Sequence, residues 1–246
     1  SAVSVVYTTA GVVKRFIFHV RNPDLVIIDT AVIAQAPSRF LVAGMGDALA
    51  TWFEAEACRV KHAPNVTRDH GSLLAYGASR QCYEALLEHG LNAKLSCEAH
   101  VVTPALESIV EANTLLSGLG FESGGLAAAH AIHNGLTVLP ATHAYFHGEK
   151  VAFGVLASLF LTGKSPELID EVYEFCEQVA LPTTLESVGL GVATDDELLQ
   201  VAQQSVVKGE SIHNEPVPVT AESVSAALKM ADVYGRHRLG WVCQGR

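Results

Sequence analysis

Most of the chain, from Pro37 onward, is patterned for α-helices, and this stretch constrains the fold more than any other feature. Residues with high helix propensity (Ala, Leu, Glu and Gln) dominate it. Helix starts are marked by a capping residue before proline, at Thr103-Pro104 and Ser165-Pro166, and by the capping-box residues Thr194 and Glu197. Thr220 precedes the last helical run. The signals for helix ends are Gly90, Gly118, Gly163, Leu181-Pro182 and Gly209. The pattern predicts helices near residues 38–62, 68–89, 98–117, 123–138, 148–162, 166–179, 195–208 and 221–237.

The first 36 residues have a different pattern, typical of β-structure. Residues 4–8 and 15–20 are rich in β-branched and aromatic side chains and predict a hairpin around Gly11. The run 24–29 is short and mainly apolar, which predicts a strand buried on both faces. So few strands do not make a stable sheet, so they resemble the edge of a larger one. We therefore predict a β fragment over residues 1–36 and an α-helical domain over residues 37–246.

Composition narrows the classes of function. The chain has 16 Lys and Arg against 26 Asp and Glu, a net charge of −10, which disfavours nucleic acid and anionic membranes as partners. No apolar run reaches the roughly 18 residues of a membrane helix, and no signal peptide is visible. Five cysteines without a CxxC pair indicate reduced thiols in a cytoplasmic protein. The high mean hydropathy of +0.27 predicts large buried helix or subunit interfaces, and hence a homo-oligomer.

One stretch of the helical part is unusually rich in histidine. His130, His133, His143 and His147 lie within it, and the first two are three apart, so they share a helix face. A turn between Gly135 and Pro140 would let His147 face His130. Imidazole is the commonest metal ligand, so two histidines from separate helices could form half of a metal site that needs a third, anionic ligand. A buried histidine cluster satisfied by backbone carbonyls explains the spacing equally well.

A carboxylate between glycines is a second unusual feature. Asp47 follows Gly44 and Gly46 and precedes an apolar helical run. In one interpretation Asp47 is an N-cap and the glycines mark a break between helices. In the other, the glycines allow a close approach and the carboxylate is a ligand. Taken alone, the pattern favours the capping interpretation.

Together these residues carry a family resemblance. Residues 44–55, 118–135 and 147–154 resemble the bacterial NAD-dependent glycerol dehydrogenases of the iron-containing alcohol dehydrogenase superfamily, and the similarity extends to about residue 235. The resemblance implies a catalytic Zn²⁺ bound by Asp47, His130 and His147, with the substrate hydroxyl in the open position. It also implies that glycerol is oxidised to dihydroxyacetone with NAD. His133, one turn from His130, is implied to be a group behind the ligands or on the nicotinamide side.

The chain departs from this family at its N-terminus. The family begins with a Rossmann-like domain that carries a Gly-rich pyrophosphate loop, whereas here the glycine pairs 118/120 and 124/125 follow helical runs. The resemblance therefore implies a mostly α chain: a helical metal-binding domain preceded by a short β fragment of a truncated Rossmann-like domain. Ser1, Val3 and Tyr7 match the family segment that contacts the cofactor, although a plain β-strand explains that segment too. The family's substrate-binding Asp, upstream of this segment, has no counterpart.

Several functions remain open from the sequence. The first is an NAD-dependent glycerol dehydrogenase, of which this chain is the metal-binding part. The second is a non-catalytic, truncated metal-binding and oligomerisation module of the same family. A third keeps the superfamily but changes the reaction, to a dehydroquinate-synthase-like lyase or an iron-dependent diol dehydrogenase; the run 121–134 favours glycerol dehydrogenase over these. One Asp and two His suit Fe²⁺ as well as Zn²⁺.

Overall fold

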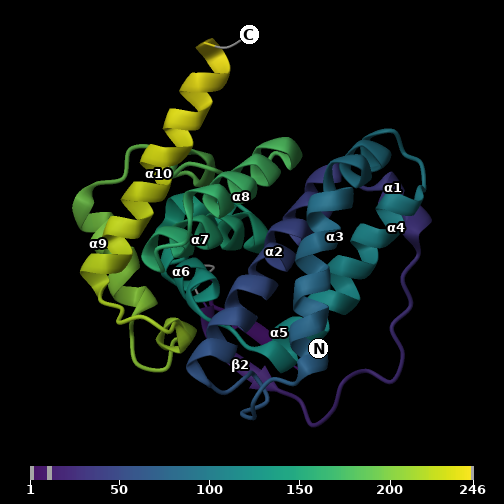
Figure 1. The fold of residues 1–246 in the computed structure, drawn as a ribbon, viewed down its shortest axis with the longest axis horizontal. Helices are drawn as coiled ribbons and strands as arrows, with labels where there is room; N and C mark the ends of the chain where they lie inside the picture. The colour runs from purple at the N-terminus through teal and green to yellow at the C-terminus, as the bar shows by residue number, and fades with distance from the viewer. Residues whose placement is uncertain (1–2, 10–12, 245–246) are drawn as a thin grey trace.

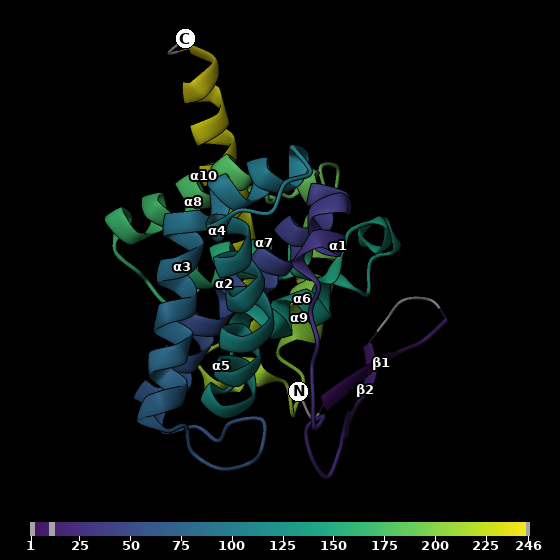
Figure 2. The ribbon, with the colours of Figure 1, turned by 90° about the vertical axis from the view of Figure 1, so that its right-hand side faces the viewer.

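The computed structural model describes residues 3–9 and 13–244, and within them it is mostly helical (Figure 1). Two strands, β1 (Val3–Tyr7) and β2 (Val13–Phe18), pair antiparallel, with Ser4 opposite Ile17. The predicted hairpin is thus confirmed, with strand ends shifted by one or two residues. The turn predicted at Gly11 lies outside the described residues. Figure 2 shows the hairpin to one side of the helices.

The predicted strand at residues 24–29 is wrong. This segment is extended but unpaired, and its apolar side chains are exposed, with Leu25 at 73% and Ile27 at 82%. A strand forms only where a neighbour supplies ladder hydrogen bonds, and within residues 3–9 and 13–244 nothing pairs with this one. The segment leads instead into α1 (Thr30–Gln35), a short helix that the pattern did not predict and whose first turn is capped by Asp29.

The helical part follows the predicted capping signals closely. Thr103 and Ser165 cap α4 and α8 in front of proline, and Thr194 forms the predicted capping box with Glu197. The long helices are α2 (Ser38–Lys61), α3 (Leu73–Glu98), α4 (Pro104–Glu111), α5 (Ser117–Gly124), α6 (Ala128–Leu136), α7 (His147–Leu161), α8 (Pro166–Val179), α9 (Asp195–Ser205) and α10 (Ala221–Gln244). One π-helical turn (Ala112–Leu116) joins α4 to α5, and 3₁₀ turns cover Pro140–Ala144, Glu186–Val188 and Ser211–Asn214.

Some predicted helix ends are wrong because glycine serves packing rather than termination. α3 runs through Gly90, where a Cβ would collide with Phe175 of α8, and the helix continues to Glu98. It starts at Leu73, later than predicted, because Ser72 caps it. The helix predicted at 98–117 runs from Pro104 through Gly118 to Gly124, with the π-helical turn inside it.

The core is built around α2 and α7, which pack against each other. α7 is buried from Gly148 to Leu159, and from Val151 onward this buried stretch is apolar apart from Ser158, as expected of a helix in a core. The two backbones touch where Gly46 faces Gly148: a Cβ on Gly46 would collide with the carbonyl of Gly148, and one on Gly148 with that of Ala43. This contact brings the first turn of α7 beside the middle of α2. No helix among the described residues is both long and apolar enough to span a bilayer.

Candidate metal centre

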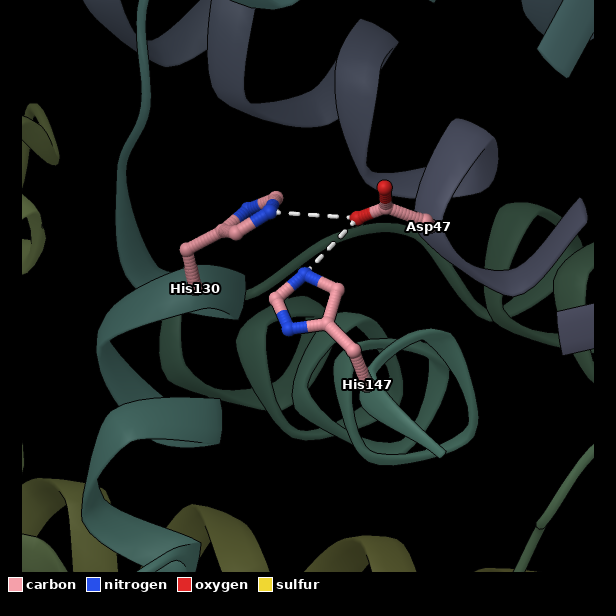
Figure 3. Close-up of side chains that lie close together, drawn as sticks. All are labelled: Asp47, His130 and His147. Atoms are coloured by element: carbon pink, nitrogen blue, oxygen red, sulfur yellow. Dashed lines mark ion pairs between the residues drawn. The ribbon is translucent and has the colours of Figure 1, made fainter. Parts of the chain in front are cut away.

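Three side chains from three helices converge on one point (Figure 3). Asp47 comes from the middle of α2, His130 from the first turn of α6, and His147 is the first residue of α7. The Oδ1 atom of Asp47 lies 3.2 Å from the Nε2 atom of His130 and 3.2 Å from that of His147. Since Asp47 and its glycines lie inside one continuous helix, the interpretation of Asp47 as an N-cap is wrong.

The geometry around Asp47 fits a metal ion. Its Oδ1 atom is buried and has no hydrogen-bond partner among the described residues, although two imidazole nitrogens point at it. Ligand atoms 2.0–2.1 Å from a tetrahedral zinc ion lie about 3.3 Å from one another, close to the spacing seen here. One carboxylate oxygen and two imidazole nitrogens suit Zn²⁺ and also Fe²⁺. Metal binding by these residues stays a prediction.

His130 is held by the buried carboxylate of Glu54. Glu54 Oε2 accepts a hydrogen bond from His130 Nδ1 at 2.6 Å, and Oε1 accepts from the backbone N–H groups of Ala127 and His130 at 2.9 and 3.0 Å. The sequence at the start of α6 offers no side-chain cap of its own, so this distant carboxylate caps it. The bond to Nδ1 leaves Nε2 free to face Asp47.

The charges in this cluster shift one another's pKa values. Burial works against a charged His130, but the carboxylates of Glu54 and Asp47 outweigh burial and raise its pKa to about 10. Burial also works against a charged Asp47, yet the facing imidazoles of His130 and His147 hold its pKa well below the usual range. Asp47 is therefore an anion, as a metal ligand must be.

His133 lies behind His147 and does not contact Asp47. Its Nε2 atom lies 3.0 Å from His147 Nδ1, and its Nδ1 atom lies 3.1 Å from the side-chain oxygen of Asn134. Burial lowers the pKa of His133 well below its ordinary value. His143, the fourth histidine of the stretch, bonds instead to the carbonyl of Thr137 and takes no part in the cluster. The expected role of His133 next to the ligands remains a prediction.

A cavity of about 720 Å³ opens beside the cluster. Its wall includes Asp47, His130 and His147 themselves, together with amide, hydroxyl and apolar side chains from α2, α5 and the loops around them. The lining residues also include Val5, Glu54, Asn65, Arg68, Ser117, Glu210, Ser211 and Asn214. The cluster of Asp47, His130 and His147 is therefore open to a small molecule on one side.

The predicted cofactor contacts are only partly described. Ser1 lies outside the described residues. Val3 and Tyr7 are the first and last residues of β1, and the structure describes their backbone. Val5, between them on the same strand, lines the cavity. Contact of Ser1, Val3 and Tyr7 with a cofactor stays a prediction.

Sequence reasoning missed the acidic residues that support the cluster. Glu54 follows Asp47 by seven residues, two helical turns along the same face of α2, and this spacing was the available signal. Glu215 accepts from the backbone N–H of Ala128 at 3.0 Å, and Glu210 accepts from the side-chain amide of Asn134 at 3.0 Å. These two lie around a 3₁₀ turn after α9 and reach the cluster only through the tertiary fold, so no local pattern pointed to them.

Comparison with known proteins gives close relatives, although no family model matches the chain. A glycerol dehydrogenase of Thermotoga maritima is 65% identical over 238 residues, which cover 97% of this chain and 65% of the relative. A glycerol dehydrogenase of Citrobacter freundii is 51% identical over 239 residues, covering 97% of this chain and 66% of the relative. The crystal structure of a probable glycerol dehydrogenase from Sinorhizobium meliloti superposes with a TM-score of 0.94 at 43% identity, covering 96% of this chain and 66% of that one. The chain thus spans slightly less than two thirds of the length of these relatives.

Proposed function

Because this chain belongs to the glycerol dehydrogenase family of the iron-containing alcohol dehydrogenase superfamily, we propose that it is the metal-binding part of an NAD-dependent enzyme that oxidises glycerol to dihydroxyacetone. In this proposal residues 37–246 form the metal-binding domain, and residues 1–36 are what remains of a nucleotide-binding domain. The observation that carries it is the convergence of Asp47, His130 and His147 on one buried oxygen, beside a cavity, in a chain 65% identical to a glycerol dehydrogenase.

The three converging side chains would hold a zinc ion. Three protein ligands leave a coordination position open, as a catalytic site requires. When bound, zinc supplies Lewis acidity that lowers the pKa of a coordinated alcohol hydroxyl, and an ionised alcohol is the better hydride donor. Asp47 contributes the negative charge of the site, and Glu54 keeps the Nδ1 proton of His130 pointed away from the metal position.

The cavity wall suits an uncharged polyol. The side chains of Asn65, Ser117 and Asn214 can exchange hydrogen bonds with hydroxyl groups. Carboxylates of Glu54 and Glu210 also line the cavity, and Arg68 is the only Lys or Arg among its described lining residues. Such a wall disfavours a negatively charged substrate.

We assign the remaining space to the nicotinamide end of NAD. Val5 of β1 lines the cavity, which supports the role expected of its neighbours Val3 and Tyr7, and of Ser1. Pyrophosphate binding draws on a Gly-rich turn at a helix N-terminus, and the residues of this chain offer no such turn after a strand. NAD therefore needs further residues for tight binding.

Two further properties belong to the proposal. Four of the cysteines, Cys58, Cys82, Cys97 and Cys176, are buried free thiols, which agrees with a reducing compartment such as the cytoplasm. Exposed apolar side chains of the segment 24–29 and of Leu73 and Leu74 agree with self-association into a homo-oligomer.

The test compares the 246-residue chain with the same chain extended by whatever in-frame sequence is encoded upstream. We expect the longer protein to produce NADH from glycerol and to lose this activity with Asp47→Asn. We expect the short chain to bind about one zinc ion by elemental analysis but to bind NAD at least ~100-fold more weakly, about 2.7 kcal/mol. A stop codon directly upstream, or a longer protein inactive on glycerol, would favour the non-catalytic module instead.

A further inference from the structure

A chain of hydrogen bonds leads away from His147 to a carboxylate on another segment. His147 Nδ1 lies 3.0 Å from His133 Nε2, and His133 Nδ1 lies 3.1 Å from Asn134 Oδ1. The side-chain nitrogen of Asn134 then donates to Glu210 Oε2 at 3.0 Å. His133 is 1% exposed and Asn134 is 8% exposed, so the middle of this chain is shielded from water.

The direction of each bond follows from its far end. A carboxylate only accepts hydrogen bonds, so Glu210 orients the Asn134 amide with its nitrogen outward and its oxygen toward His133. The amide oxygen also only accepts. The Nδ1 atom of His133 must therefore carry the proton that it shares with Asn134.

The same logic then reaches His147. The hydrogen bonds of buried His133 go to an amide and an imidazole rather than to a carboxylate, and such a buried imidazole is uncharged. With the proton on Nδ1, its Nε2 atom has a lone pair and accepts from His147 Nδ1. His147 then carries its own proton on Nδ1. Its Nε2 atom, 3.2 Å from Asp47 Oδ1, is then the ring nitrogen that a metal ion would bind.

We propose that Glu210, Asn134 and His133 are positioning residues that hold His147 in the Nδ1–H tautomer and so make its Nε2 atom the metal-binding atom. This inference rests on the proposed function, in which Asp47, His130 and His147 hold a metal. The three residues oppose an intrinsic preference, because an isolated neutral imidazole favours the proton on Nε2, the atom that must be free here.

The experiment reads the tautomer directly on an Asp47→Ala form of the 246-residue chain labelled with ¹⁵N-histidine, in which neither a metal ion nor the Asp47 carboxylate competes for His147 Nε2. The ¹⁵N shifts of the two ring nitrogens distinguish the Nδ1–H form from the Nε2–H form. We expect His147 to be in the Nδ1–H form in this chain and to shift toward the Nε2–H form when Asn134→Ala is added. With Asp47 present, Asn134→Ala should lower the affinity for Zn²⁺, measured by chelator competition, by about 10- to 100-fold, as is usual when the partner of a histidine ligand is lost.

Two variants at Glu210 separate orientation from general damage. Glu210→Gln can turn its side-chain oxygen toward Asn134, so we expect it to keep both the tautomer and the zinc affinity. Glu210→Leu cannot, and should reproduce the Asn134→Ala result; it serves as the test on its own if Asn134→Ala does not fold. His143→Gln is the matched control, because His143 bonds to the Thr137 carbonyl, outside the chain from His147 to Glu210, and should leave both readings unchanged.

The outcomes separate this inference from the proposed function. The inference is overturned if Asn134→Ala and Glu210→Leu leave His147 in the Nδ1–H form with zinc affinity within twofold of wild type. It is also overturned if His147 of the Asp47→Ala chain is in the Nε2–H form. The predicted tautomers in that chain, together with a wild-type chain that binds no zinc, would refute the metal site while leaving the positioning chain intact.

Discussion

The two histidines of the candidate metal centre are held by opposite means. His130 meets a carboxylate directly, since Glu54 accepts its Nδ1–H at 2.6 Å. From its Nδ1 atom, His147 reaches a carboxylate, that of Glu210, through two intermediates, His133 and Asn134. The direct contact places a negative charge against the ring, whereas an uncharged chain supplies orientation alone. The Nδ1 atom of His130 is thus held by a charged group, and the Nδ1 atom of His147 by an uncharged one.

His130 and Glu54 form the direct arm of the site, and His147, His133, Asn134 and Glu210 form the other arm. The two arms differ in what they contribute to the fold. Glu54 also accepts from two backbone N–H groups at the start of α6, so the His130 arm is part of the fold as well as of the site. The His147 arm begins at the N-terminus of α7, where the carboxylate of Glu149 already caps the helix and Gly148 packs on α2. The hydrogen-bond chain through His133 and Asn134 is therefore not needed to hold the start of α7, and it can act on His147 alone.

The largest effect is expected where the two arms meet, at Asp47. Asp47→Asn removes the negative charge that both histidines face, and the affinity for zinc should fall at least about 1,000-fold, about 4 kcal/mol. Chelator competition on the purified chain measures it. His62→Gln, which changes the C-cap residue after the same helix, should have no effect. Zinc affinity within tenfold of wild type in the Asp47 variant would mean that the metal binds elsewhere.

The next largest effect is expected for Glu54, which holds His130 directly. Glu54→Ala leaves two buried backbone N–H groups without partners, at about 1–3 kcal/mol each, so the free energy of unfolding should fall by about 2–6 kcal/mol. Asn134→Ala should destabilise the fold less, because no backbone group depends on that side chain among its described hydrogen bonds. Urea denaturation of the two variants measures this contrast.

Glu56→Gln is the matched control for the direct arm. Glu56 lies on the same helix but pairs with Lys164 near the surface, so its loss should cost at most about 1 kcal/mol. Equal destabilisation by the Glu54 and Asn134 variants would remove the difference between the arms.

How much of this could be predicted from the sequence differs between the arms as well. The candidate ligands could be predicted, because His130 and His147 flank a turn and the run around them is specific to a family. Glu54 had a signal in its spacing from Asp47, since both lie on one face of a regular helix. Glu210 had none, because its position depends on how the loop after α9 returns to α6.

Errors in the fold prediction have a common physical cause. Gly44, Gly46 and Gly90 suggested helix ends, yet all three lie inside helices at points where a neighbouring residue approaches closely. Local propensity cannot distinguish a glycine that ends a helix from one that admits a neighbour. The strand predicted at residues 24–29 failed for the complementary reason, since its composition suits a sheet but no paired neighbour is present in the described residues.

A smaller effect concerns pH and the second carboxylate at the start of α6. Burial, reinforced by the charge of Glu54 and opposed by Lys164 and Lys61, raises the pKa of Glu215 to about 7. Since the ordinary value is 4.5, the folded state holds this proton more tightly than the unfolded state does. Its contribution to the free energy of unfolding is therefore full below about pH 4.5 and is lost as the pH rises to about 7.

Glu215→Gln keeps an oxygen for the Ala128 N–H but cannot ionise. Relative to wild type, this variant should be more stable at pH 8 than at pH 5, by about 1–3 kcal/mol. Urea denaturation at the two pH values measures it. The sign of the difference decides: a relative loss at pH 8 would show that Glu215 is stabilised as an anion by the α6 N-terminus.

The smallest expected effect is the coupling between the two arms. If Glu54 acts through His130 and Asn134 acts through His147, each variant changes the aim of one ligand only. The losses of zinc-binding free energy in Glu54→Gln and Asn134→Ala should then add in the double variant to within about 0.5 kcal/mol. Chelator competition on the four proteins of this cycle gives the coupling.

A network shared through Asp47 would instead give losses that do not add, because the His130 and His147 rings lie with centroids only 5.4 Å apart and face the same Asp47 oxygen. A coupling above about 1 kcal/mol would therefore mean that the arms exchange strain or charge through Asp47, and that the distinction between a charged and an uncharged arm does not survive in the metal complex.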